Sequence, residues 1–382
     1  MTAHATIVIA GGGTGGHVFP GLAVASALRK LAGDRVEIVF VGSPRGLEKD
    51  IIPARGHRLE LLDVEPMKGG GVRRAMRGAL VAARATWRAR ALVKKLAPAV
   101  VLSVGGYAAG PLALAAALAG VPLAILEPNG VLGLANRLLA PFAKRAYVAW
   151  PSAEARLSTR IVRSMGVPLR DGFVARPYTA RRHARDRPMR VLVMGGSQGA
   201  RAINDAMPDA LGVVAARVPD LVVVHQCGRG HRGEVKDDDA LRSAYTKVGI
   251  RADVRPFLDD VAGALADADV VVSRSGAVTV AEIAAVGRAA IFVPFPFAAD
   301  DHQRSNAEAL SSVGAAICLV QRDATSPRLG EEISALLEDD TRRCAMADAA
   351  RRAGRPNAAG DIAADLLRLA NLPETHAVLE AR

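Results

Sequence analysis

The chain has 382 residues, of which half are apolar and only 4% are aromatic, and it carries a net charge of +12. This length fits two domains, and a core built from Ala, Val, Leu and Ile is typical of α/β layers with buried parallel strands. The three cysteines, Cys227, Cys318 and Cys344, show no metal-ligand spacing. They give no disulfide framework and favour a reducing cytoplasm.

The first half of the chain alternates strands with helices. It predicts strands at 6–10, 36–42, 58–62, 99–103, 123–126 and 145–149, and helices from about 18, near 44–52, at 72–96 and at 111–119. No residue from Val104 to Leu126 is charged, which leaves a membrane span as the alternative. The breaks at Gly110-Pro111 and Gly120-Val121-Pro122 favour a turn, a helix, a turn and a buried strand. The N-terminus runs directly into a strand, so we expect no signal peptide.

The second half repeats this alternation after an Arg-, Pro- and Gly-rich linker at 164–189. Strands are predicted at 191–194, 221–225, 251–255, 269–273 and 290–293, followed by an amphipathic helix at about 357–370. We therefore expect two Rossmann-like, doubly wound α/β domains facing each other across a cleft. Their expected bounds are 1–165 and 166–352, and the tail 353–382 carries a helix that packs back on the first domain.

The first glycine-rich turn, Gly11 to Gly16, follows the apolar run Ile7 to Ala10 and opens a helix. Such a turn places backbone N–H groups at a positive helix end, where phosphate can bind. It also satisfies the G-x-G-x-x-G pattern of dinucleotide-binding proteins. That pattern needs an acidic residue at the end of the second strand, and here the strand ends in Gly42-Ser43. Hydride transfer is therefore disfavoured.

His17 directly follows these glycines at the start of the helix. The helix dipole disfavours imidazolium, so His17 should be neutral at pH 7 and able to accept a proton. The alternative is a histidine that only forms a hydrogen bond to the turn.

Two further strand–turn–helix units lie in the second half. Gly195 to Gly199 follows the apolar run Val191 to Met194, and residues 269–282 form the other unit. In the latter, Glu282 can accept hydrogen bonds from both hydroxyls of a ribose, although Thr279-x-x-Glu282 also fits a capping box. Farther on, His302 and Gln303 could contact a sugar or cap the following helix. The run 237–239 lacks partners for a metal site and is interpreted as a solvated loop.

Three motifs together resemble one known family. They are AGGGTGGHVFPGLAV at 10–24, GGSQGAR at 195–201 and SRSGAVTVAEI at 273–283, and they are similar to the MurG family of GT-B glycosyltransferases over about residues 5–370. The resemblance implies inverting transfer of N-acetylglucosamine from UDP-GlcNAc to the C4 hydroxyl of the undecaprenyl-linked muramoyl-pentapeptide. This reaction converts lipid I to lipid II in peptidoglycan synthesis, which serves cell shape and cell division. The resemblance also implies a peripheral protein at the cytoplasmic face of the inner membrane.

The resemblance assigns roles to individual residues. The residues expected to act in catalysis are His17, as general base, with Glu127 and Asn129. Those expected to face the reacting sugar and the acceptor are Thr14, Gly15, Gly16, His17 and Asn129. The donor is expected to contact Ser197 and Arg170 at the diphosphate, Leu258, Ala277, Val278 and Thr279 at the uracil and phosphate, Glu282 at the ribose, and Gln303 at the sugar. No metal and no cofactor are expected.

The chain departs from the family's usual residues in three places. Leu126 and Pro128 stand where the family usually has His and Gln, and Val167 stands where it usually has Asn. These changes predict an altered cleft wall and hinge, with a slower enzyme or a shifted acceptor preference, while the donor motifs are intact.

The positive charge is concentrated in the first half of the chain. Residues 1–165 hold 22 Lys and Arg against 9 Asp and Glu, whereas residues 166–382 hold 28 against 29. In the predicted helix 72–96, apolar and basic residues interleave. The residues expected to contact an anionic membrane are Met76, Leu80, Trp87, Arg73, Arg74 and Arg77. The alternative is an ordinary helix with a solvated basic face.

The expected partners are UDP-GlcNAc, the undecaprenyl-linked muramoyl-peptide, an anionic membrane surface and cell-wall synthesis proteins, and not nucleic acid. Two other classes stay open at this stage. One is a different GT-B enzyme, such as a natural-product glycosyltransferase or a UDP-sugar epimerase. The other is a non-catalytic scaffold at the membrane periphery.

Overall fold

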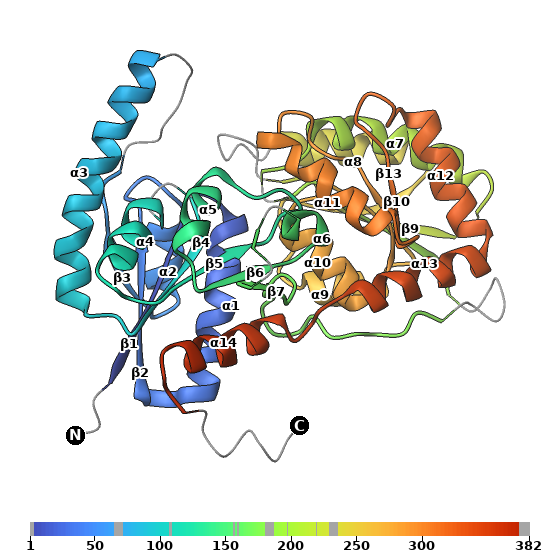
Figure 1. Ribbon diagram of the computed structural model, residues 1–382. Helices are drawn as coiled ribbons and strands as arrows, with labels where there is room; N and C mark the ends of the chain where they lie inside the picture. The colour runs from blue at the N-terminus through green and yellow to red at the C-terminus, as the bar shows by residue number, and fades with distance from the viewer. Residues whose placement is uncertain are drawn as a thin grey trace. The chain divides into compact units, whose positions relative to one another are not determined.

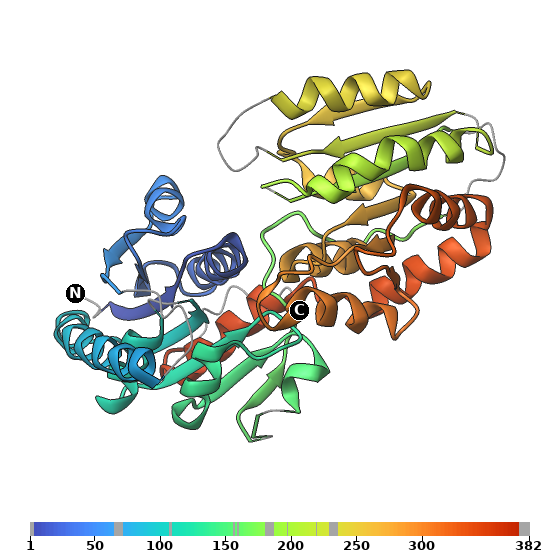
Figure 2. The same cartoon turned by 90° about the horizontal axis from the view of Figure 1, so that it is seen from above.

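The structure is a computed structural model that describes residues 4–64, 72–106, 109–155, 157–158, 160–179, 187–196, 198–218, 220–228 and 236–373, with only the backbone described at 72–83 and 236–237. The chain forms two compact units (Figures 1 and 2). The first unit comprises Met1–Asp171 and Asn357–Arg382, and the second comprises Gly172–Pro356.

The first unit is built on a sheet of seven parallel strands in the order β3-β2-β1-β4-β5-β6-β7. The strands are β1 (Ala5–Gly11), β2 (Val36–Gly42), β3 (Arg58–Leu61), β4 (Val100–Gly105), β5 (Leu123–Glu127), β6 (Arg145–Val148) and β7 (Val162–Ser164). Alternate residues of β1 enter different cores, Ile7 and Ile9 on one face and Val8 and Ala10 on the other. Because both faces are covered, the strands are continuous apolar runs.

Helices cover both faces of this sheet. They are α1 (Gly15–Ala32), α2 (Glu48–Ala54), α3 (Val72–Leu96), α4 (Ala109–Leu118), α5 (Leu134–Leu139), α6 (Pro151–Glu154) and α14 (Ala358–Leu369), with the short 3₁₀ turns η1 (Gly33–Arg35) and η2 (Ala140–Phe142). Figure 1 shows α3 on one side of the sheet and α1 with α14 on the other. The C-terminal helix α14 therefore returns to the first unit. The Asp365 carboxylate secures it by accepting hydrogen bonds from Tyr147 Oη at 2.9 Å and Arg145 Nε at 3.1 Å.

The second unit repeats the plan with six parallel strands in the order β10-β9-β8-β11-β12-β13. The strands are β8 (Met189–Met194), β9 (Leu221–Gln226), β10 (Arg251–Arg255), β11 (Val270–Ser273), β12 (Ala289–Phe292) and β13 (Ala316–Cys318). The helices, which flank this sheet (Figure 2), are α7 (Arg201–Ala215), α8 (Lys236–Lys247), α9 (Val261–Asp267), α10 (Ala277–Val286), α11 (His302–Ser311), α12 (Ser326–Glu338) and α13 (Asp340–Ala353), with the turn η3 (Ala299–Asp301).

A buried carboxylate fastens the start of the second unit to its sheet. Asp269 is fully buried and accepts hydrogen bonds from Tyr178 Oη at 2.5 Å and from the Arg187 guanidinium at 2.6 and 2.7 Å. Burial opposes ionisation, but these donors hold the pKa of the Asp269 carboxyl below its usual value. The stretch that enters β8 is thereby held by charge-assisted bonds.

The uncharged stretch from Val104 to Leu126 contains the end of β4, then α4, and most of β5. This matches the expected turn, helix and strand. Among the described residues, no helix combines the length and the apolar character needed to cross a membrane.

One sequence interpretation was wrong. The acidic run 237–239 lies within α8 and not in a solvated loop. Asp238 is buried, and its Oδ1 lies 3.1 Å from the Cys227 Sγ that donates to it. The sequence pattern predicts a surface position for Asp238. In the structure its side chain instead packs against Cys227, directly after β9, and this contact explains its burial.

Candidate functional site

Both sheets have the strand order of a Rossmann fold, in which the order reverses at one point. The reversal lies between β1 and β4 in the first unit, and between β8 and β11 in the second. Ligands of such sheets bind at the carboxyl ends of the strands at this point. All three turns singled out in the sequence follow one of these strands, so the fold places them where binding is expected.

The first of these turns positions His17 at the N-terminal end of α1. His17 Nδ1 lies 3.2 Å from the carbonyl oxygen of Gly12 and 3.3 Å from Thr14 Oγ1. A carbonyl oxygen only accepts, so this contact assigns the proton of the neutral ring to Nδ1. Gly105, at φ +95°, lies on the other side of the ring, and a Cβ there would be 3.1 Å from Nε2. The ring is therefore oriented by backbone groups of two neighbouring turns.

The turn also contacts a carboxylate that sequence reasoning missed. Glu48, in α2, is 1% exposed, and its two oxygens accept from the backbone N–H of Gly13 and of Ser43, each at 2.8 Å. A Cβ at Gly12, Gly42 or Gly46 would approach this side chain within 2.1, 2.4 and 2.0 Å. These glycines make room for a protein carboxylate, and the Gly13 N–H donates to that carboxylate. The signal in the sequence was the pair of glycines at 42 and 46 directly before an acidic helix start.

Glu127 organises the turn after β5. It is buried, and its Oε1 accepts from Asn129 N and Nδ2, both at 3.1 Å, while its Oε2 accepts from Gly133 N at 2.8 Å and Asn136 Nδ2 at 3.0 Å. Four donors on one carboxylate fix the orientation of Asn129. Asn136 is a supporting residue that the sequence did not indicate.

The three departures from the family pattern are apolar and buried. Leu126 is 0% exposed and Val167 is 2% exposed. Pro128 is also buried, and its carbonyl oxygen accepts from Trp150 Nε1 at 3.1 Å. Each replacement packs without leaving a polar side chain to satisfy.

The second glycine turn packs closely against the end of β9. A Cβ at Gly199 would lie 2.3 Å from the Cys227 carbonyl oxygen. Below the turn, Asn204 Nδ2 donates to that same carbonyl at 3.0 Å, and Asn204 Oδ1 lies 3.1 Å from Nε2 of the fully buried His225. Tyr245 Oη completes this series of hydrogen bonds, at 2.8 Å from His225 Nδ1. Ser197 lies outside the described residues.

The third turn leads from β11 into α10, and Glu282 lies in the middle of this helix. The N-cap of α10 is Gly276, so Thr279 is already helical and does not form a capping box with Glu282. Glu282 is 8% exposed, while Ala277, Val278 and Thr279 begin the helix.

Neighbouring side chains brace this turn. Asn306 Nδ2 in α11 donates to the Ser275 carbonyl oxygen at 3.1 Å. Gln303 Oε1 accepts from Phe295 N at 3.0 Å, and His302 Nδ1 lies 2.7 Å from the Ala299 carbonyl oxygen. Both predicted sugar-contact residues thus have backbone partners at the loop before α11.

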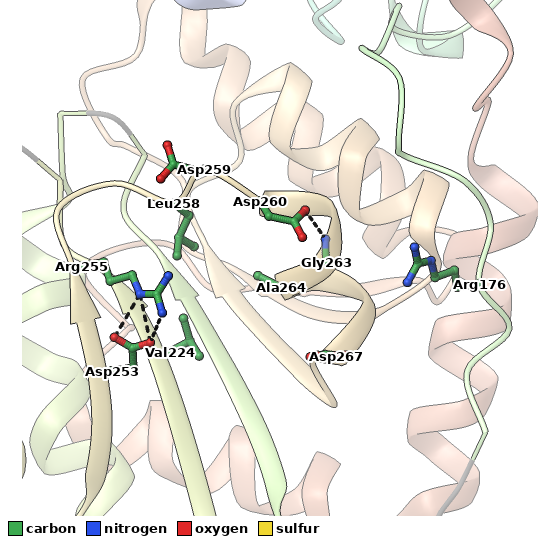
Figure 3. A pocket seen from close by; sticks show the side chains of 10 residues that line it. All are labelled: Arg176, Val224, Asp253, Arg255, Leu258, Asp259, Asp260, Gly263, Ala264 and Asp267. Carbon is green, nitrogen blue, oxygen red and sulfur yellow. Dashed lines mark hydrogen bonds and ion pairs between the residues drawn. The ribbon is translucent and has the colours of Figure 1, made fainter.

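A pocket of about 380 Å³ lies in the second unit (Figure 3). Leu258, the predicted uracil contact, lines it together with Arg176, with residues of α9 as far as its last residue Asp267, and with residues of β9 and β10. Asp260 caps α9 by accepting from Gly263 N at 2.8 Å, and Arg255 pairs with Asp253 at 2.6 Å. Six of its ten lining residues are charged, and four of these are aspartates, so this pocket is more polar than most small-molecule sites.

The remaining predicted residues lie in the first unit. Arg170 is exposed, next to Asp171, the last residue of the first segment of this unit. In α3, Trp87 is 76% exposed, whereas Ala85, Ala89 and Val93 are buried against the sheet. The side chains of Met76, Leu80, Arg73, Arg74 and Arg77 lie outside the described residues.

Two family models match the chain. The glycosyltransferase family 28 N-terminal domain matches residues 7–148, and the glycosyltransferase family 28 C-terminal domain matches residues 190–362. The chain belongs to glycosyltransferase family 28. This family 28 chain has the expected fold of two parallel α/β units, and the expected GT-B class is confirmed.

Full-length relatives agree with this assignment. A protein of Sorangium cellulosum (strain So ce56), named UDP-N-acetylglucosamine--N-acetylmuramyl-(pentapeptide) pyrophosphoryl-undecaprenol N-acetylglucosamine transferase, is 50% identical over 98% of this chain and 90% of its own length. A protein of the same name from Acidithiobacillus ferrooxidans (strain ATCC 53993 / BNL-5-31) is 42% identical over 96% of this chain and 98% of its own. The crystal structure of MurG from Acinetobacter baumannii is 31% identical with a TM-score of 0.78, and the match covers 95% of this chain and 99% of that one.

Proposed function

We propose that this family 28 chain transfers N-acetylglucosamine from UDP-GlcNAc to the C4 hydroxyl of undecaprenyl-linked muramoyl-pentapeptide, which converts lipid I to lipid II. The observation that carries the proposal is the 50% identity over 98% of the chain to the Sorangium transferase. The name of that relative states the sugar, its nucleotide and the lipid-linked acceptor.

In the proposed reaction, His17 is the general base. The acceptor C4 hydroxyl gives its proton to His17 Nε2, and its oxygen forms the new bond to C1 of the sugar. The bond from C1 to the β-phosphate oxygen breaks, and its electron pair leaves with UDP. Attack opposite the leaving group inverts the anomeric centre and gives a β-1,4 link. The contact of Nδ1 with the Gly12 carbonyl supports this role, because it leaves the ring lone pair on Nε2.

Glu127 and Asn129 act beside this base in the proposal. Glu127 holds Asn129 through two hydrogen bonds of 3.1 Å, so we assign Asn129 to the acceptor and Glu127 to its orientation. Gly15 and Gly16 begin α1 and Thr14 is its N-cap, at a helix end where backbone N–H groups favour an electron-rich ligand.

Most of the donor contacts are assigned to the second unit. Glu282 would hold the ribose hydroxyls, Leu258 the uracil, and Gln303 the sugar. The N-terminal residues Ala277, Val278 and Thr279 of α10, with Ser197 and Arg170, would stabilise the departing diphosphate. The ten-residue helix α10, which begins at Ala277 with Gly276 as its N-cap, supplies the dipole for this role.

We assign a membrane-facing role to α3. A lipid-linked acceptor requires the enzyme to work at a bilayer, and α3 carries several basic residues and a 76% exposed Trp87. Basic amphipathic helices bind anionic lipid surfaces. The proposed location is therefore the cytoplasmic face of the inner membrane, with peripheral attachment.

The deciding experiment is a transfer assay with radiolabelled UDP-GlcNAc and two acceptors, the lipid-linked muramoyl-pentapeptide and the same muramoyl-pentapeptide without lipid. We expect a labelled β-1,4 disaccharide on the lipid-linked acceptor. Transfer that prefers a water-soluble acceptor would instead indicate a natural-product glycosyltransferase. Sugar interconversion without an acceptor would indicate an epimerase, and binding without turnover would indicate a scaffold.

A further inference from the structure

A buried carboxylate beside His17 has no role in the proposed transfer. Glu48 comes from α2, a different element from the one that carries His17, and it is 1% exposed. Its Oε2 accepts from Gly13 N at 2.8 Å and its Oε1 accepts from Ser43 N at 2.8 Å. A buried, hydrogen-bonded carboxylate imposes a fixed orientation on the groups that donate to it.

One of these donors belongs to the peptide group that His17 contacts. The N–H of Gly13 and the C=O of Gly12 are the two polar ends of a single planar amide. The N–H end donates to Glu48, and the C=O end lies 3.2 Å from His17 Nδ1. Because hydrogen bonds along such a chain polarise one another, a carboxylate on the N–H end makes the carbonyl oxygen a better acceptor.

We propose that Glu48 is a positioning residue for His17 and acts through the Gly12–Gly13 peptide. It strengthens the hydrogen bond from Nδ1–H to the Gly12 oxygen and thereby keeps the neutral ring in the tautomer with its lone pair on Nε2. In a serine-protease triad, a carboxylate that contacts the histidine directly has this task; here one peptide group lies between them. This inference rests on the proposed role of His17 as the base.

The surrounding glycines preserve this geometry. A Cβ at Gly12 would come within 2.1 Å of Glu48, and Cβ atoms at Gly42 and Gly46 would come within 2.4 and 2.0 Å. On the other side, Gly106 has φ +90°, and a Cβ there would lie 2.4 Å from the Gly12 oxygen. Glycine at these positions lets the carboxylate reach one end of the peptide and keeps the other end accessible to His17.

The test uses the full-length protein labelled with ¹⁵N-histidine. The His17 signals are assigned by their loss in His17→Ala, and the ring nitrogen shifts report the tautomer. We expect the wild-type protein to show a protonated Nδ1. In Glu48→Gln we expect a mixture of tautomers and a kcat lowered about 10- to 100-fold, with the Kd for UDP-GlcNAc unchanged, because the variant keeps the side-chain size but removes the charge.

Asp365→Asn is the matched control. This change also converts a buried carboxylate of the first unit to an amide, and Asp365 accepts from Tyr147 and Arg145. We expect it to leave the His17 tautomer and kcat as in the wild-type protein while lowering the melting temperature. A Glu48→Gln variant that behaved like this control would overturn the proposal.

The wild-type spectrum tests the inference even where Glu48→Gln does not fold. A wild-type His17 protonated on Nε2 would contradict the relay, whatever the variant does. Failure of the proposed function is a separate result: His17→Ala with normal kcat would remove the base role. The tautomer shift in Glu48→Gln would then still show that Glu48 orients the ring.

Discussion

His17 has two features that a neutral base needs: a helix N-terminus that disfavours its charged form and a backbone partner for Nδ1 at 3.2 Å. Replacing His17 with Ala should therefore lower kcat about 10²- to 10⁴-fold, the usual contribution of a general base. The Kd for UDP-GlcNAc should stay within about twofold, because most of the donor contacts are assigned to the second unit. Steady-state kinetics and calorimetry measure the two quantities, and a large loss of donor affinity would contradict the assignment.

Glu282 is 8% exposed, and the N-cap of α10 is Gly276, so a capping box with Thr279 does not account for it. We expect Glu282→Ala to weaken UDP-GlcNAc binding about 10²- to 10⁴-fold, because two hydrogen bonds to a charged group contribute about 1.5–3 kcal/mol each. The kcat at saturating donor should change much less. Calorimetric titration gives the affinity, and Glu282→Gln is the control that keeps the shape. An unchanged Kd in both variants would assign Glu282 to helix packing alone.

Among the helices, α3 gives the most direct test of membrane attachment. Its residues Ala85, Ala89 and Val93 are buried, and Trp87, 76% exposed, is not on their face. Changing Arg73, Arg74 and Arg77 together to Gln should remove about 1 kcal/mol of lipid attraction per residue. Binding to vesicles that contain phosphatidylglycerol should fall about 100-fold, while binding to neutral vesicles should be unaffected. Cosedimentation measures both.

A matched triple change in the second unit provides the control. Arg217, Arg322 and Arg352 are exposed, and their replacement by Gln lowers the net charge equally. This variant should bind anionic vesicles as the wild-type protein does. If both triple variants lose the same affinity, the attraction depends on total charge, and the role of α3 is refuted.

Most strands could be predicted from the sequence because both faces of each sheet are covered. A strand such as β8 then appears as an uninterrupted apolar run, Val191 to Met194, directly before a glycine turn. Two of the elements that were not predicted, α12 and α13, have 13 and 14 residues. Others are short: β7 and β13 have three residues each, and α5 has six. Segments of this length carry too few positions to show a period.

Functional residues could be predicted only where they lie in or close to a glycine turn in the sequence. His17 and Glu282 lie within or just after glycine turns, so the local pattern pointed to them. Glu48 does not, because its partners Gly13 and Ser43 are brought to it by two different strands. The roles of such carboxylates depend on tertiary contacts, which a single sequence does not display.

The two units share a strand order, but different buried polar side chains lie next to their glycine turns. The first unit has the carboxylate of Glu48, and the second has the hydrogen-bonded series Asn204–His225–Tyr245. Because Asn204 Nδ2 donates to Cys227, its Oδ1 accepts from His225 Nε2–H, and His225 Nδ1 accepts from Tyr245. The neutral form of His225 thus satisfies both neighbours.

This arrangement makes the stability of the second unit sensitive to acid. Burial lowers the pKa of His225 from 6.5 to about 3, so below about pH 6.5 the unfolded chain binds a proton that the folded chain excludes. Stability is therefore complete above pH 6.5 and should decrease by about 1.4 kcal/mol for each pH unit from there towards pH 3. Denaturant unfolding between pH 7 and 5, where most carboxylates stay ionised, measures this slope. In His225→Gln, which cannot titrate, we expect lower stability at pH 7 but a clearly flatter profile; His57, whose pKa burial also lowers, contributes equally to both proteins. Equal slopes in the two proteins would show that His225 does not control the acid response.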